Sequence, residues 1–116
     1  MNINSYVQHN IYDELMENIK YYPFFGNLAN PLKIRIVGML KEKEMSVLDI
    51  AKLLNEEQSK ISHALKSLKN CAIVQMKQKG KQRIYCLNKE TILPILEILD
   101  KHENKYCKKC LAKGMK

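Results

Sequence analysis

Three side chains near the carboxyl end of the chain could bind a soft metal ion. His102, Cys107 and Cys110 fall within nine residues. Imidazole and thiolate ligands suit zinc, cadmium or copper(I), and two thiols can bind arsenite. A closed zinc site needs four ligands, so a missing ligand would have to come from another subunit, from His9 or from water. Nearby lysines favour the reactive thiolate; they are Lys105, Lys108 and Lys109.

Other interpretations of the cysteines stay open. Cys107 and Cys110 could form a disulfide as a redox sensor, or residues 106–116 could be a flexible, solvent-exposed basic tail. We expect Cys71 and Cys86 to be buried structural cysteines, because Cys71 closes a predicted helix and Cys86 points inward from a predicted strand.

The net charge of the chain is concentrated in one segment. Residues 58–89 contain eight basic residues and no acidic one, whereas the remaining twelve basic and twelve acidic residues balance, so the formal +8 belongs to this segment. A local positive field of this kind is typical of proteins that bind a polyanion. Nucleic acid is therefore the partner that the charge pattern favours.

The same segment begins with polar side chains at helical spacing. Gln58, Ser59, Ser62 and His63 would face outward and could reach base edges in a major groove, although a solvated helix surface would show the same pattern. The expected phosphate contacts are Lys60, Lys66, Lys77, Lys79, Lys81 and Arg83.

Hydrophobic periodicity predicts the elements that position these residues. We expect a first helix that ends near Tyr22-Pro23, a second from about Pro31, a third capped by Ser46, a fourth after Glu56-Glu57, and a last helix from Thr91. Asn55 suits the tight turn between the third and fourth helices. The last helix has an apolar stripe of Ile92, Ile95, Leu96, Ile98 and Leu99.

Between the fourth and last helices the period changes to two. Val74 and Met76, then Ile84 and Cys86, alternate with polar residues around Gly80, which predicts a β-hairpin. The fold class is therefore mainly α with a small β-hairpin, a winged helix-turn-helix. We assign residues 1–105 to one DNA-binding and dimerisation domain and residues 106–116 to the tail.

Three motifs resemble the ArsR/SmtB repressors. Residues 28–36 (LANPLKIRI) are similar to the family's LADPTRLRIL, Asp49-Ile50-Ala51 with residues 58–68 to DLA…SQSTVSHHLKVL, and the Gly80 hairpin ending in residues 83–87 to GRxVYYRL. The resemblance covers roughly residues 28–99. It implies a homodimeric repressor that pairs through its first and last helices and is released from DNA by a metal ion or metalloid. The stripes of those two helices could instead complete the monomer core.

The family's known metal patterns are incomplete here. Its CVC motif corresponds to Ser46-Val47-Leu48, which lacks both thiols. Its D-x-H pattern matches Asp100 and His102, but the downstream partners fall on Lys113 and Lys116, which cannot serve as ligands.

Other function classes are disfavoured. There is no phosphate-binding glycine loop, no plausible carboxylate pair and no βαβ context for a thioredoxin-like CxxC, so we expect no enzyme. No apolar run is long enough for a membrane span, and the first ten residues lack the apolar stretch of a secretory signal, so we expect a cytoplasmic protein. The predicted function is sequence-specific transcriptional regulation on double-stranded DNA, with a winged-helix DNA-binding or protein-interaction module that has no inducer as the alternative.

Overall fold

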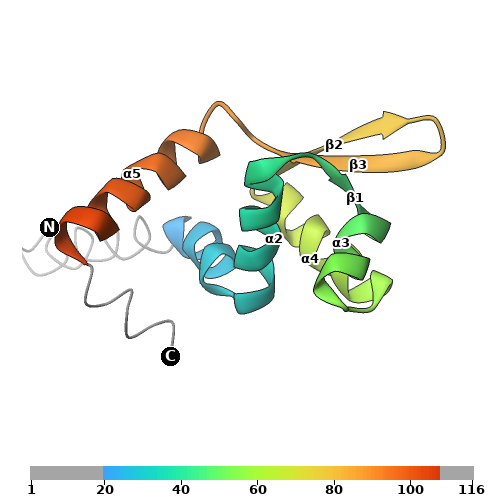
Figure 1. Ribbon diagram of the computed structural model, residues 1–116, viewed down its shortest axis with the longest axis horizontal. Helices are drawn as coiled ribbons and strands as arrows, with labels where there is room; N and C mark the ends of the chain where they lie inside the picture. The colour runs from blue at the N-terminus through green and yellow to red at the C-terminus, as the bar shows by residue number, and fades with distance from the viewer. Residues whose placement is uncertain (1–19, 108–116) are drawn as a thin grey trace, which may run out of the picture.

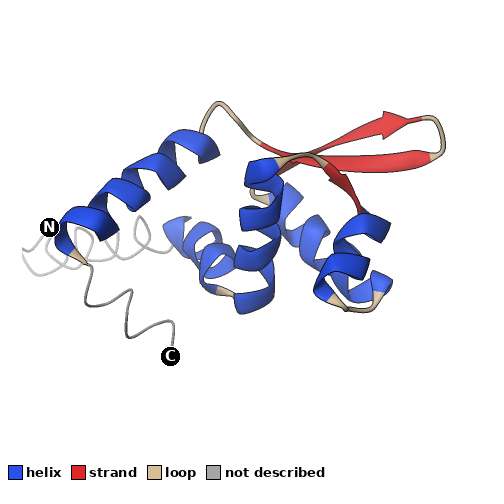
Figure 2. Ribbon diagram, in the orientation of Figure 1, coloured by secondary structure: helices blue, strands red, loops and turns tan. Residues whose placement is uncertain are grey.

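The computed structural model describes residues 20–107. Residues 20–29 are helical, and after them come α2 (Pro31–Glu42), β1 (Met45–Ser46), α3 (Val47–Leu54), α4 (Gln58–Asn70), β2 (Val74–Lys79), β3 (Gln82–Leu87) and α5 (Ile92–Tyr106). The strands form one antiparallel sheet in the order β1-β3-β2. Helices α2, α3 and α4 gather together, the β2–β3 hairpin projects to one side of them and α5 lies on the other (Figure 1, Figure 2). This is the predicted winged helix-turn-helix.

Local signals set the helix boundaries. Asn30 caps α2 by accepting a hydrogen bond from the Lys33 amide at 3.0 Å, and Pro31 occupies the first helical turn. Ser46 and Asp49 form a reciprocal capping box at the start of α3. Asn55 ends α3 in the left-handed conformation at φ 53°, as its place in the predicted tight turn requires. The turn between α3 and α4 is thus encoded within a few residues.

One hydrophobic core joins the helices to the sheet. Its fully buried members come from every layer and include Ile36, Ile50, Ile61, Leu65, Leu68, Ile73 and Ile92. Burying each such side chain contributes roughly 1.5–3 kcal/mol. The inward face predicted for α4, with Ile61, Ala64, Leu65 and Leu68, is confirmed.

The hairpin register differs from the predicted alternation in β3. Val74 pairs with Leu87 and Met76 with Tyr85, so Leu87 and Tyr85 share the core face with the two β2 residues. Ile84 and Cys86 are buried on the opposite face of the sheet and do not belong to the core cluster. The prediction that Cys86 is buried is confirmed, but the core face assigned to β3 was wrong because four consecutive apolar residues hide the alternation.

The predicted end of the first helix at Tyr22-Pro23 is also wrong. Residues 20–29 are helical through Pro23. Proline removes one backbone donor but leaves the rest of the helical hydrogen bonds in place. Phe24 and Leu28 pack against the core, and this tertiary packing offsets the local preference to stop.

The apolar stripe predicted for the last helix is only partly buried. Ile92 is fully buried, and Ile95 and Leu96 pack against the core. Ile98 and Leu99 remain 64% and 45% exposed. No helix within residues 20–107 is long and apolar enough to cross a membrane.

The capping box predicts a measurable loss of stability. Ser46→Ala removes the hydroxyl oxygen that accepts from the Asp49 amide at 3.1 Å, so we expect the free energy of unfolding to fall by about 1 kcal/mol. Ser59→Ala is the matched control, because Ser59 is exposed, and we expect it to change stability by less than about 0.5 kcal/mol. Equal urea midpoints for the two variants would contradict the role of the cap.

Candidate nucleic-acid interface

Burial of one face of α4 fixes which side chains the helix presents. Ile61, Leu65 and Leu68 point into the core, so the opposite face is turned to solvent. The structure places all the predicted base-facing residues on this exposed face, together with Lys66: Gln58, Ser59, Ser62 and His63. Amide and hydroxyl groups in this position can donate to and accept from base edges.

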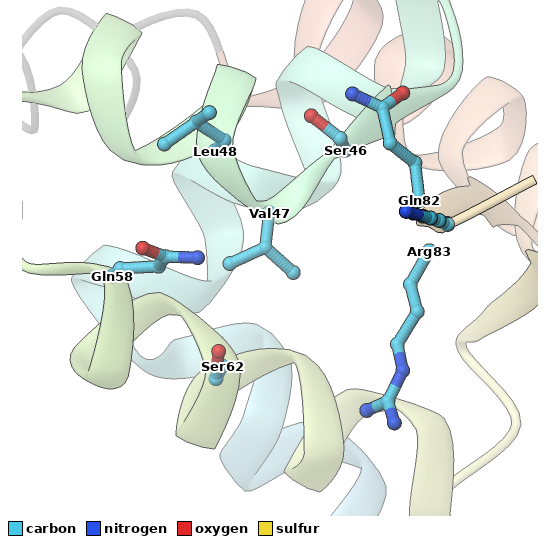
Figure 3. Close-up of a pocket in the computed structure, with 8 residues that line it drawn as sticks. Ser46, Val47, Leu48, Gln58, Ser62, Gln82 and Arg83 are labelled. Atoms are coloured by element: carbon cyan, nitrogen blue, oxygen red, sulfur yellow. The ribbon is translucent and has the colours of Figure 1, made fainter.

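An open hollow connects this helix to the β2–β3 hairpin, which is the wing of the fold. It has a volume of about 340 Å³ and is lined by residues from the start of α3, from α4 and from the hairpin: Ser46, Val47, Leu48, Gln58, Ser62, Lys81, Gln82 and Arg83. In Figure 3 the Arg83 side chain extends from the wing along the same hollow as Ser62. The polar start of α4 and two wing cations therefore share one concave surface.

The register sorts the cations of the hairpin onto different faces. Arg83 pairs with Gln78 and lies on the same face of β3 as Tyr85, which is the face that meets the core. Lys77 pairs with Ile84 and Lys79 with Gln82, so both lysines lie on the opposite face. The predicted phosphate contacts in the two strands are thus divided between the two faces of the hairpin.

Glu44 holds the two lysines on that opposite face. Its carboxylate oxygens lie 3.1 Å from the Lys77 ammonium and 2.6 Å from that of Lys79. The hydrogen bonds from Lys79 and Lys77 lower the pKa of Glu44, and the bond to Glu44 raises the pKa of Lys77. This carboxylate reduces the free positive charge of the wing.

The sequence prediction missed Glu44 because it counted charge along the chain. Glu44 precedes β1, and the two-residue β1 pairs with β3, which brings the carboxylate beside the wing. In the sequence, the only feature that could have indicated β1 is Met45, an apolar residue directly before the helix cap Ser46. A strand of two residues gives too short a pattern to be recognised.

The remaining predicted phosphate contacts also differ in their pairing. Lys60 forms an ion pair with Glu56 at 3.2 Å, one helical turn before it. Lys66, Lys81 and Arg83 are exposed, and no carboxylate within residues 20–107 forms an ion pair with them. These three cations are the most available to a phosphate.

A polar network anchors the carboxyl end of α4. Asn27, only 6% exposed, donates to Cys71 Sγ at 3.0 Å and accepts from Ser67 Oγ at 2.7 Å and Lys33 Nζ at 2.8 Å. Cys71 closes α4 as predicted, but it is only half-buried, so the burial predicted for this cysteine is wrong. The network ties α4 to the helix of residues 20–29 and to α2.

The candidate metal ligands are only partly brought together. His102 Nε2 lies 3.3 Å from Cys107 Sγ at the end of α5, whereas Cys110, like His9, lies outside the described residues. Asp100 instead pairs with Lys41 at 3.0 Å, and the hydrogen bond from Lys41 to this carboxylate raises the pKa of the lysine. Within the described range no cluster of three or more His, Cys, Asp or Glu side chains could hold a metal ion. The His102 and Cys107 donors fit a soft metal by type but supply only two ligands.

Comparisons with known proteins agree with this architecture. Residues 30–76 match the family described as "Bacterial regulatory protein, arsR family". The chain is 31% identical over 64 residues to a transcriptional repressor SmtB homolog of Synechocystis sp., covering 55% of this chain and 48% of that one. It is 32% identical over 76 residues to the cadmium resistance transcriptional regulatory protein CadC of Listeria innocua, covering 65% and 64%. The chain thus spans about half to two thirds of these relatives.

Solved structures extend the likeness beyond α4 and the wing. Rv0081 of M. tuberculosis is 26% identical with a TM-score of 0.72, covering 83% of this chain and 96% of that one. The homodimeric winged helix-turn-helix DNA-binding domain of Mb0332 from Mycobacterium bovis is 19% identical with a TM-score of 0.69, covering 81% and 85%, and supports the fold alone. The helix-turn-helix segment of this chain thus matches the arsR family model, and the chain is similar to transcriptional regulators such as the SmtB homolog.

Proposed function

We propose that this protein is a transcriptional repressor that binds double-stranded DNA sequence-specifically as a homodimer in the cytoplasm. The observation that carries the proposal is the shared concave surface of α4 and the wing, where Gln58 and Ser62 lie across from Lys81 and Arg83. The relatives are named as transcriptional regulators, and none of the names describes an enzyme.

The arrangement suits insertion of α4 into the major groove. Gln58, Ser59, Ser62 and His63 then read base edges, because their short polar groups lie on the exposed side of the helix. Lys66, Lys81 and Arg83 neutralise phosphates on either side. Lys60, Lys77 and Lys79 are each paired with a carboxylate, which weakens their attraction for a phosphate.

Exposed apolar side chains outside the DNA-facing surface support dimerisation. Tyr21, Tyr22 and Phe25 are exposed on the helix of residues 20–29, and Ile98 and Leu99 on α5. Large apolar groups gathered on these helices are typical of an interface. Twofold pairing would place two α4 helices in successive major grooves, so the DNA site would be an inverted repeat.

A metal or thiol effector acting near the carboxyl end completes the proposal. His102 and Cys107 already face each other, and Cys110 follows three residues later. Zinc, cadmium, copper(I) or arsenite suit these donors, and one relative carries cadmium resistance in its name. A regulator without an inducer is the alternative that the second experiment below distinguishes.

Neutralising the free wing cations tests DNA binding. We expect Lys81→Gln with Arg83→Gln to weaken binding to every duplex, and the slope of log affinity against log salt to flatten by about 2 for each protomer of the bound dimer, because each phosphate contact contributes about 0.9. The measurement is fluorescence anisotropy over a salt series. Lys101→Gln with Lys105→Gln on α5 removes the same charge away from the wing and should leave the slope unchanged. Identical slopes in the two double variants would refute the wing contacts.

Replacing the thiols tests the effector. We expect zinc, cadmium or arsenite to release wild-type protein from DNA, and Cys107→Ser with Cys110→Ser to abolish the response, since serine binds soft ions weakly. The readout is anisotropy of a preformed DNA complex during titration. If both proteins respond alike, these cysteines are not the sensor; if neither responds, the regulator has no such inducer.

A further inference from the structure

We propose that Glu44 sets the DNA affinity of the wing by competing with DNA phosphates for Lys77 and Lys79. The inference rests on the proposed function, since it assigns a role to a carboxylate beside the cations of the wing. Nothing in the sequence motifs of this chain points to Glu44.

The geometry makes the competition specific. One carboxylate binds both ammonium groups, with one oxygen 3.1 Å from Lys77 and the other 2.6 Å from Lys79. The pairing of Met45 with Tyr85 and of Ser46 with Ile84 fixes the chain directly after Glu44 against β3. The sheet therefore fixes the backbone next to Glu44 beside the wing, which keeps the carboxylate within reach of both lysines.

The charges explain the effect on binding. Lys77 and Lys79 would present two positive charges, but with Glu44 the cluster carries a net charge of one. A phosphate oxygen offers the same acceptor chemistry as a carboxylate oxygen, so a DNA phosphate competes with Glu44 for the charge and the N–H donors of each lysine. The bonds from these lysines also lower the pKa of Glu44, so the competitor stays ionised near neutral pH.

Exposure limits the strength of the competition. The side chains of Lys77 and Lys79 are 55% and 60% exposed, and ion pairs of this kind are weak. Glu44 therefore tunes affinity without blocking the wing. It keeps sequence-independent attachment low, because wing contacts to phosphates carry no base information.

A double-mutant cycle tests the proposal. The probe is a fluorescein-labelled duplex of mixed sequence, which suffices because phosphate contacts do not depend on the bases. We expect Glu44→Gln to tighten binding about 3- to 10-fold at low salt. In a background carrying Lys77→Gln and Lys79→Gln, Glu44→Gln should change nothing. Glu42→Gln is the control, because it removes the same charge two residues away and Glu42 makes no ion pair with the wing within the described residues.

The outcomes separate this inference from the proposed function. An equal gain from Glu42→Gln, or a gain that survives loss of both lysines, would show a general charge effect and overturn the competition. No gain from Glu44→Gln, while Lys81→Gln with Arg83→Gln still weakens binding, would overturn the role of Glu44 alone. If no variant binds the duplex in a salt-dependent way, the DNA-binding function itself fails.

Discussion

The burial of one apolar face of α4 is the constraint on which the interface depends. Ile61, Leu65 and Leu68 lie in the core, and their position fixes the rotation of the helix about its axis. A rotation by one residue would bury Ser62 and expose Leu68, and the lost apolar burial would cost roughly 1.5–3 kcal/mol for the leucine alone. The polar face is therefore held outward by the same packing that stabilises the domain. The Asn27 network adds a second restraint at the other end of the helix.

The antiparallel register of β2 and β3 likewise decides which face of the wing each cation lies on. It directs Arg83 to the side of α4 and directs Lys77 and Lys79 to the other face, where Glu44 meets them. A wing that looks uniformly basic in sequence thus has one face with available cations and one with paired cations. In the proposed function, the two strands of the wing supply the electrostatic attraction to DNA, and Glu44, directly before β1, restrains it.

Much of this organisation could be predicted from local patterns. The cap at Ser46, the left-handed Asn55 and the Gly80 turn each depend on neighbouring residues, so they are readable in order along the chain. The inward face of α4 follows from helical periodicity. The core face of β3 could not be read, because residues 84–87 are all apolar and only pairing with β2 decides which of them face inward. Glu44 could not be found either, since its partners lie more than thirty residues away and meet it only through β1.

The most direct test is a nuclear magnetic resonance titration of isotope-labelled protein with duplex DNA. We expect backbone amide shifts to change in residues 58–66 and 81–83 and the changes to fade as salt is added, because phosphate contacts are screened. Shifts confined to other surfaces, or no salt-sensitive shifts at all, would contradict the assignment of α4 and the wing as the DNA-binding surface.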